Sequence, residues 1–228
     1  KNKEYALFNK YADDWWNENG VFKVLHLIRP IRLKYILNQI NNPKNKKLKI
    51  LDVGCGGGLV SESLAKLGFD VTGIDFVEKN IEVAKLHSSK KKLKIRYLKR
   101  DIEKNFVKDK FDIIIIFELL EHLEDWKDFL SKIKRNLNKN GIIIISTINR
   151  NIISKFLAIS VAENLLKWVP KNTHQYDKFI RPNEIDDLLK KNKFHFMNKK
   201  GLIFDPFSFD WKLSNNTSIN YFCTYKKY

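Results

Sequence analysis

The stretch Leu51-Asp52-Val53-Gly54-Cys55-Gly56-Gly57-Gly58 decides the fold that this sequence predicts. An apolar run ends in it and a helical pattern begins just after it, which is typical of a strand–turn–helix junction. Glycines suit such a junction, because the backbone turns tightly there and a ligand can approach the chain closely. We therefore expect a ligand-binding turn at the end of the first strand of an α/β sheet.

The glycine spacing and a following acid indicate which ligand. Gly54, Gly56 and Gly58 alternate with other residues, and Leu59 stands where a dinucleotide site needs its third glycine. Asp75 ends the next apolar run, about 20 residues after the first glycine, where a carboxylate can accept both ribose hydroxyls of an adenosine. The pattern therefore favours S-adenosylmethionine, which contains an adenosine but no pyrophosphate, so that the shorter glycine turn suffices. A ligand-free loop or a nicotinamide or flavin site is the weaker alternative.

Strands and helices alternate outward from this turn, which predicts a parallel, doubly wound sheet. We expect a Rossmann-like class I methyltransferase fold: a mostly parallel, seven-stranded sheet with helices on both faces. The expected strands are residues 48–53, 70–74, 95–99, 112–117, 142–145, 196–204 and 219–225, and the expected helices are 61–67, 78–87, 126–137 and 182–191. Asn140-Gly141 reads as a turn before the fifth strand.

The length fits one domain. Its 228 residues divide into an N-terminal helical cap (1–42), a cofactor-binding core (48–147), an insertion after the fifth strand (149–179) and a C-terminal part of the sheet (182–228). A hydrophobic share of 43% and a charged share of 30% exclude a disordered chain. No apolar run approaches the ~20 residues of a bilayer span. Two distant cysteines favour a reducing compartment.

The net charge of +17 favours an anionic partner, although Lys, Asn and Ile are abundant throughout and composition alone could produce it. Basic residues are scattered and no compact aromatic–basic motif for single strands is evident. We therefore expect no nucleic-acid partner, and an RNA-binding methyltransferase is the minor alternative. The anionic partners that remain are a membrane surface and an acidic substrate.

Further cofactor contacts follow from topology, because ligands bind at the carboxyl ends of parallel strands. Asp101 and Ile102 follow the third strand and could face an adenine. Phe117 ends the fourth strand and could flank the methionine moiety. Each of the three also has a purely structural interpretation.

Acids and a histidine follow the fourth strand. If Glu118, Glu121 and His122 lie on a helical turn, their side chains share a face and could bind Mg²⁺, Mn²⁺ or Zn²⁺. The alternative is that Glu121 or His122 shapes the site or acts as a general base without a metal. His174, within the insertion, is a second candidate for the base.

The insertion carries an amphipathic pattern. An apolar stripe is flanked by basic residues and consists of Ile153, Leu157, Val161, Leu165, Trp168 and Val169. Such a helix either packs on its own domain or forms a lid that enters a membrane interface, where Trp and Lys or Arg are well suited.

With these residues in view, the chain resembles the ubiquinone-biosynthesis O-methyltransferases over nearly its whole length. The glycine motif indicates only the superfamily, whereas the N-terminal and insertion motifs are more specific. The resemblance rests on Trp15-Trp16, Phe22-Lys23-x-Leu25-His26, Pro30-Ile31-Arg32-Leu33-x-Tyr35-Ile36, Leu51 to Gly58, Val83-Ala84-Lys85-Leu86-His87, Glu118-x-Leu120-Glu121-His122, Ser146-Thr147-Ile148-Asn149-Arg150, Val169-Pro170-Lys171-x-Thr173-His174, Phe179-Ile180-x-Pro182, Asp205-Pro206 and Ile219-Asn220-Tyr221.

The resemblance implies methyl transfer from S-adenosylmethionine to a phenolic hydroxyl of a polyprenylated catechol or hydroquinone. It places Arg32, Gly54, Asp75 and Phe117 at the cofactor, with Arg32 pairing with the cofactor's carboxylate. Phe117 stands where the family often has a smaller or more flexible residue. The resemblance also implies a metal at Glu118, Glu121 and His122. Another small-molecule methyltransferase is the strongest rival.

The same resemblance suggests where the protein works. We expect a cytoplasmic protein that associates peripherally with an anionic membrane, on the mitochondrial matrix side if the source is eukaryotic. Contacts with other ubiquinone-biosynthesis enzymes would follow from that location.

Overall fold

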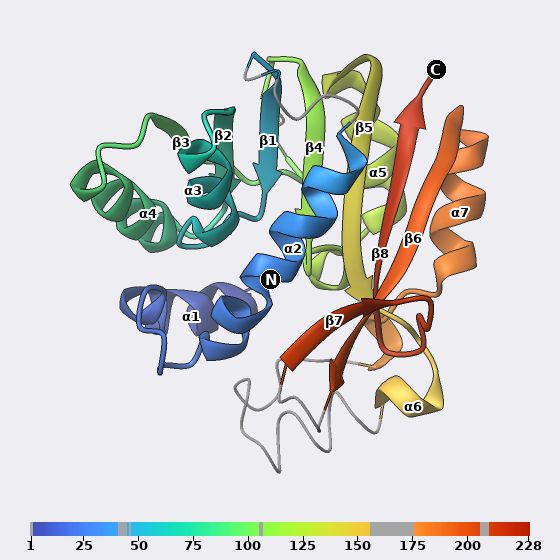
Figure 1. The fold of residues 1–228 in the computed structure, drawn as a ribbon, viewed down its shortest axis with the longest axis horizontal. Helices are drawn as coiled ribbons and strands as arrows, with labels where there is room; N and C mark the ends of the chain where they lie inside the picture. Colours follow the sequence, from blue (N-terminus) through green and yellow to red (C-terminus); the bar gives the residue numbers. More distant parts are fainter. Residues whose placement is uncertain (1, 41–44, 46, 105–106, 156–175, 206–209) are drawn as a thin grey trace.

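The structure is a computed structural model that describes residues 2–40, 45, 47–104, 107–155, 176–205 and 210–228. Figure 1 shows a central sheet with helices in front of it and behind it. In chain order the elements are α1 (Asn2–Lys10), the 3₁₀ helix η1 (Ala12–Asp14), α2 (Lys23–Gln39), β1 (Lys49–Val53), α3 (Leu59–Lys66), β2 (Asp70–Asp75), α4 (Glu78–Lys90), β3 (Ile95–Lys99), β4 (Phe111–Phe117), η2 (Leu120–His122), α5 (Trp126–Ile133), η3 (Lys134–Asn136), β5 (Leu137–Ile148), α6 (Ile152–Ser154), η5 (Tyr176–Lys178), α7 (Pro182–Lys191), β6 (Phe194–Asp205), β7 (Asp210–Ser214) and β8 (Asn220–Lys227).

The first five strands form the expected parallel half of the sheet. The whole sheet has the order β3-β2-β1-β4-β5-β8-β6-β7, and β3, β2, β1, β4 and β5 pair in parallel. In this register Ile114 lies between Leu51 of β1 and Ile143 of β5. These strands therefore end at one edge, the lower one in Figure 1, where α1, η2 and β7 also lie.

The other half of the sheet corrects the expected strand number. The part of the chain that the structure describes forms eight strands in a mixed sheet, not seven mostly parallel ones. Strand β8 runs antiparallel to both β5 and β6, and β7 runs antiparallel to β6. The unexpected strand is β7, a short edge strand in which Trp211 and Leu213 alternate with polar residues and pack against α2.

Two other expectations were wrong in detail. The helix expected at 126–137 ends at Ile133, and Leu137 already belongs to β5. The Asn140-Gly141 pair does not precede β5 but lies within it, where Asn140 has a φ of 62° and the register against β4 shifts. From Phe111 to Ile113 β4 advances two residues while β5 advances five, from Leu137 to Ile142, and the left-handed Asn140 lies within this irregularity.

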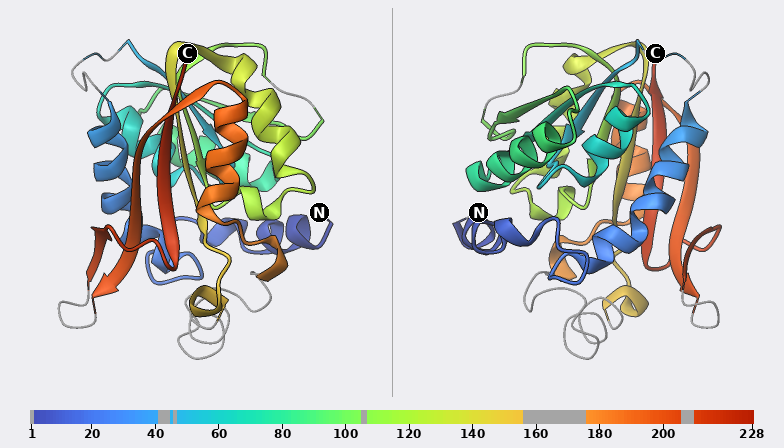
Figure 2. Two further views of the ribbon diagram at one scale, coloured as in Figure 1. Left: turned by 90° about the vertical axis from the view of Figure 1, so that its right-hand side faces the viewer. Right: turned by 60° about the vertical axis from the view of Figure 1, so that its left-hand side comes forward.

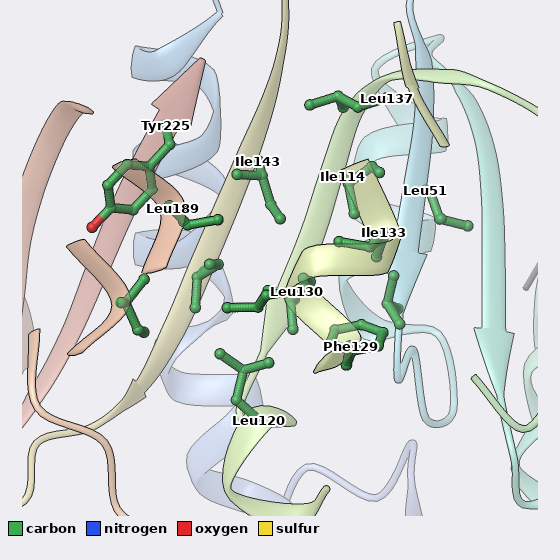
Figure 3. Close-up of a cluster of buried hydrophobic side chains, with 14 of the residues drawn as sticks. Leu51, Ile114, Leu120, Phe129, Leu130, Ile133, Leu137, Ile143, Leu189 and Tyr225 are labelled. Carbon is green, nitrogen blue, oxygen red and sulfur yellow. The ribbon is translucent and has the colours of Figure 1, made fainter. Parts of the chain in front are cut away.

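Helices cover both faces of the sheet, so that β4 is buried on each side. Ile114 and Ile116 pack with α5 and α7, whereas Ile113 and Ile115 pack with α2 and α3. Figure 2 shows α5 and α7 together on one side of the sheet, and Figure 3 shows Ile133 of α5 beside Ile114 of β4. A run of four isoleucines suits such a strand, because its side chains have no solvent-facing side.

Candidate cofactor and catalytic site

The glycine loop, residues 54–58, follows β1 and is hydrogen-bonded to the end of β2. Gly54, Gly56 and Gly58 have φ angles of 72°, 52° and 90°, which L side chains rarely adopt. The amides of Gly54 and Cys55 both donate to the carbonyl of Ile74, at 2.8 and 3.0 Å. The loop is therefore fixed against the strand that carries Asp75.

Aromatic side chains of the same chain take up space that these glycines leave. A Cβ at Gly56 or Gly57 would lie 2.3 Å from the ring of Trp15, and one at Gly58 would lie 2.3 Å from the hydroxyl of Tyr97. Close approach by a ligand is thus not the only reason for the glycines. Sequence reasoning missed this contact, although Trp15-Trp16 and the glycines both belonged to the motifs that carried the resemblance.

Asp75 is buried at the end of β2 and held by three donors. Its Oδ2 accepts the Gly56 amide at 2.9 Å, and its Oδ1 accepts the Val77 amide at 2.8 Å and Nδ2 of Asn80 at 3.3 Å. Burial raises the pKa of Asp75, and these hydrogen bonds oppose the rise. A carboxylate has about four lone-pair positions, so Asp75 can accept a further donor.

Asp52, in strand β1 just before the glycine loop, is a second buried acid, which sequence reasoning did not single out. Its Oδ2 accepts the Ser61 hydroxyl at 2.6 Å, which joins β1 to α3. Burial raises the pKa of Asp52 to about 6, while Ser61 and the charge of Arg32 act in the opposite direction. An acid within an apolar strand was the signal that could have identified it.

Arg32 projects from α2 toward the ends of β1 and β4. Its side chain is 7% exposed, one terminal nitrogen lies 3.4 Å from Oε1 of Glu118, and the guanidinium lies 5.3 Å over the ring of Phe117. Its buried Nε has no hydrogen-bond partner among the residues that the structure describes. Desolvation lowers the pKa of Arg32, and the neighbouring acids partly offset that effect.

Glu118, Glu121 and His122 do not share one helical face, which corrects the sequence expectation. Glu118 has a φ of 47° and precedes the short helix η2, so its side chain leaves in a different direction. Its Oε1 accepts the Ser146 hydroxyl at 2.8 Å, whereas Oε2 of Glu121 accepts the Thr147 hydroxyl at 2.8 Å. The His122 ring instead lies edge-on to Phe8, with 6.0 Å between ring centroids.

The two acids nevertheless interact. Glu121 is 5% exposed, and its pKa is raised well above the usual value by burial first and by the charge of Glu118 second. Across the described ranges of the chain, no group of three or more His, Cys, Asp or Glu side chains is placed to hold a metal ion. The arrangement is a buried pair of carboxylates rather than the three-ligand group expected from Glu118, Glu121 and His122.

The remaining candidates lie at the same edge or outside the described residues. Asp101 follows Arg100, whose amide donates to the Asp75 carbonyl at 2.8 Å, and Ile102 is buried in the core. Phe117 packs edge-on to Phe222 at 5.5 Å between centroids. His174 and the stripe from Leu157 to Val169 lie outside the described residues.

The chain on both sides of the insertion is hydrogen-bonded to its surroundings, at the segment before β8 and at the end of β5. The Asn149 side chain donates to the Thr217 carbonyl at 2.9 Å, and the Ile180 amide donates to the Ile148 carbonyl at 3.1 Å. Near these ties Ile152 is 82% exposed and Ile153 is 55% exposed. The insertion therefore starts beside the carboxyl edge with two apolar side chains in solvent.

Comparisons with known proteins agree with this architecture. A family model described as a methyltransferase domain matches residues 44–201. The ubiquinone biosynthesis O-methyltransferase of Rickettsia felis is 44% identical over 222 residues, which cover 96% of this chain and 91% of that protein. That of Pelagibacter ubique is 42% identical over 233 residues, covering 99% and 97%.

Solved structures show the same fold at lower identity. The magnesium protoporphyrin IX methyltransferase of Synechocystis with bound SAH has a TM-score of 0.68 at 18% identity, over 98% of this chain and 99% of that one. The plantazolicin methyltransferase BpumL in complex with a monoazolic desmethylPZN analog and SAH has a TM-score of 0.63 at 21% identity, over 99% of this chain and 96% of that one. These likenesses establish the class I methyltransferase fold.

Proposed function

The chain belongs to the ubiquinone biosynthesis O-methyltransferases and uses S-adenosylmethionine, and we propose that its acceptor is a phenolic hydroxyl of a polyprenylated catechol or hydroquinone. The family membership rests on relatives that match nearly the whole chain. The proposal adds the acceptor and assigns roles to the residues at the carboxyl edge of the sheet.

The observation that carries the cofactor assignment is the buried, unpartnered Nε of Arg32. A guanidinium donates best to a carboxylate, and the methionine part of the cofactor ends in one. At the other end of the loop, Asp75 has acceptor capacity for ribose hydroxyls. The cofactor would lie along Gly54, Gly56 and Gly58 between these two residues.

The remaining contacts follow from this placement. Asp101 and Ile102 come directly after the strand beside Asp75 and would flank the adenine. The Phe117 ring, already stacked under the Arg32 guanidinium, would border the methionine moiety. All of these residues lie at the edge where the parallel strands end.

The cofactor supplies an activated methyl group that an oxygen nucleophile can displace directly. The protein's own contribution is to align the two reactants, which can be worth up to ~7–11 kcal/mol. A phenol with a pKa of about 10 must also lose its proton, which costs about 4 kcal/mol at neutral pH. A base at the acceptor is therefore valuable.

Glu121, acting with Glu118, is the base that we favour. The raised pKa of Glu121 makes it a stronger proton acceptor than an ordinary carboxylate once it is ionised. Thr147 fixes one of its oxygens, and Glu118 also hydrogen-bonds to the Glu121 carboxyl. His122 lies at the same edge as a second candidate, and His174 remains a prediction from the sequence.

The side chains do not fit a metal held by Glu118, Glu121 and His122, because the imidazole lies against Phe8, both acids accept hydroxyls and Glu118 pairs with Arg32. We therefore derive no step through a metal. Mg²⁺, Mn²⁺ or Zn²⁺ could enter only if the two catechol oxygens completed the ligand set, and the experiment below includes that outcome.

The isoprenoid tail of the proposed acceptor favours catalysis at a membrane surface. No helix in the described part of the chain is long and apolar enough to cross a membrane. The net charge of +17 and the exposed Ile152 and Ile153 beside the site support peripheral binding to an anionic surface instead. We propose the cytoplasmic face, or the matrix face in a eukaryote, where other ubiquinone-biosynthesis enzymes would be neighbours.

The decisive experiment is methyl transfer from labelled S-adenosylmethionine to a polyprenyl catechol, with and without chelator. We expect label in the catechol under both conditions. Loss of turnover in chelator and its return with Mg²⁺ would instead support a metal completed by the substrate. Label only in an amine or a carboxylate would favour another small-molecule methyltransferase, and a salt-sensitive RNA shift would favour an RNA substrate.

A further inference from the structure

Trp15 lies between the glycine loop and the start of α4. Its ring stacks on Phe22, with 3.9 Å between centroids and 8° between planes, and covers Gly56 and Gly57 closely. Nε2 of His26 lies 2.9 Å from its carbonyl oxygen. Trp15 is 7% exposed, so its position is fixed from several sides.

The indole of Trp15 determines which way Asn80 faces. Its Nε1 donates to Oδ1 of Asn80 at 2.9 Å, and both side chains are buried. An indole nitrogen can only donate, so the amide oxygen of Asn80 must face Trp15. The amide nitrogen then faces Asp75 and donates to its Oδ1 at 3.3 Å.

Asp75 is thereby held from two directions. Asn80 and the Val77 amide donate to Oδ1, while the amide of Gly56, under the Trp15 ring, donates to Oδ2. Each donor limits the rotation of the carboxylate. A carboxylate that is fixed before binding loses less freedom when it receives two ligand hydroxyls.

We propose that Trp15 and Asn80 are positioning residues that orient the Asp75 carboxylate for the ribose of the cofactor. The inference rests on the proposed function, in which Asp75 accepts the ribose hydroxyls. It assigns a role to Trp15 and to Asn80, which the cofactor contacts alone do not explain. A purely structural role would affect every ligand of the site alike.

The test uses two ligands that differ only in the ribose hydroxyls. Calorimetry on the full chain gives the Kd of S-adenosylhomocysteine and that of its 2′,3′-dideoxy analogue. Trp15→Phe keeps a ring against Phe22 but removes the N–H, and Asn80→Asp keeps an acceptor for Trp15 but removes the donor to Asp75. The matched control is Trp16→Phe, which removes the neighbouring indole bond to the Gly57 carbonyl.

We expect Trp15→Phe to weaken S-adenosylhomocysteine by about fivefold to tenfold, the effect of one hydrogen bond. Asn80→Asp should weaken it more, because it removes the donor to Asp75 and also places a second carboxylate beside it. The dideoxy analogue should change by less than about twofold, so the preference for the hydroxyls falls. Trp16→Phe should leave that preference unchanged. Equal losses for both ligands, or no loss, would overturn the inference, and a melting curve of each variant excludes unfolding as the cause.

Asp75→Asn separates this inference from the proposed function. If it abolishes the preference while Trp15→Phe and Asn80→Asp do not, the ribose assignment stands and the inference is wrong. If Asp75→Asn leaves the preference of the unaltered protein intact, the ribose assignment itself fails and the inference fails with it.

Discussion

The guanidinium of Arg32 lies 3.4 Å from the carboxylate of Glu118, so that helix α2 contacts the residue just after the central strand β4. Arg32 also has one buried nitrogen that no described residue satisfies. The contact thus leaves the cation partly unpaired at the edge where the cofactor is expected.

The first prediction concerns that cation. Arg32→Lys should weaken S-adenosylhomocysteine about tenfold or more, because a lysine keeps the charge but loses the planar donor pair. Methylthioadenosine, which lacks the amino-acid part, should bind with a nearly unchanged Kd. Arg29→Lys, on the same helix, is the control in calorimetry. Equal losses for both ligands would show that Arg32 supports the fold and not the carboxylate.

The second prediction concerns Glu121 as the base. Glu121→Gln keeps an acceptor for Thr147 and should lower kcat by about 10²–10⁴, the range for general-base catalysis, with little change in cofactor affinity. Because burial and Glu118 raise the pKa of Glu121, turnover of the unaltered protein should fall as the pH drops through that raised pKa. The exposed Glu124→Gln is the control, and full activity of the Glu121 variant would exclude the role.

The third prediction concerns Asp52 and stability. Its folded-state pKa of about 6 lies above that of an unfolded aspartate, so its contribution is present at low pH and is lost as the pH rises through about 6. Between pH 7.5 and pH 5 this group should add about 1 kcal/mol to the free energy of unfolding. Urea titrations should show that Asp52→Asn removes the increment, whereas Asp70→Asn, at an exposed position, does not. An unchanged increment in the Asp52 variant would contradict the assignment.

The fourth prediction concerns the membrane. The protein should float with anionic liposomes at low salt, and salt should weaken the binding without abolishing it, because screening acts only on the charges. Ile152→Glu with Ile153→Glu should reduce flotation and turnover on a long-tailed catechol but spare a short-tailed one. Leu86→Glu removes a 58% exposed apolar side chain on α4 and serves as the control. If the protein instead stays with the soluble fraction at low salt, the prediction of a membrane-binding surface is wrong.

The sequence predicted the parallel core well because that core follows from local patterns. The four isoleucines at 113–116 are all buried only if their strand lies between two layers of helices. The glycines mark the turn after the neighbouring strand β1. The edge strand β7 was missed because five residues with polar neighbours give little periodic signal. Its burial depends on α2, which is distant in sequence.

The candidate site was harder, because side-chain direction depends on single backbone angles. The spacing of Glu118, Glu121 and His122 suggested one face, but the left-handed φ of Glu118 separates them. The partners of Trp15 and of Asn80 also come from different segments. No local pattern predicts such a contact.

The packing of α2 has a consequence for folding during synthesis on the ribosome. The hydroxyl of Tyr35 bonds to that of Thr224 at 3.0 Å, and the same helix packs on Leu202 and Phe222. The part of the α2 face that packs on Leu202 and Phe222 is therefore covered only after β6 and β8 have been synthesised. Until then, that part of the helix remains open to chaperones during synthesis.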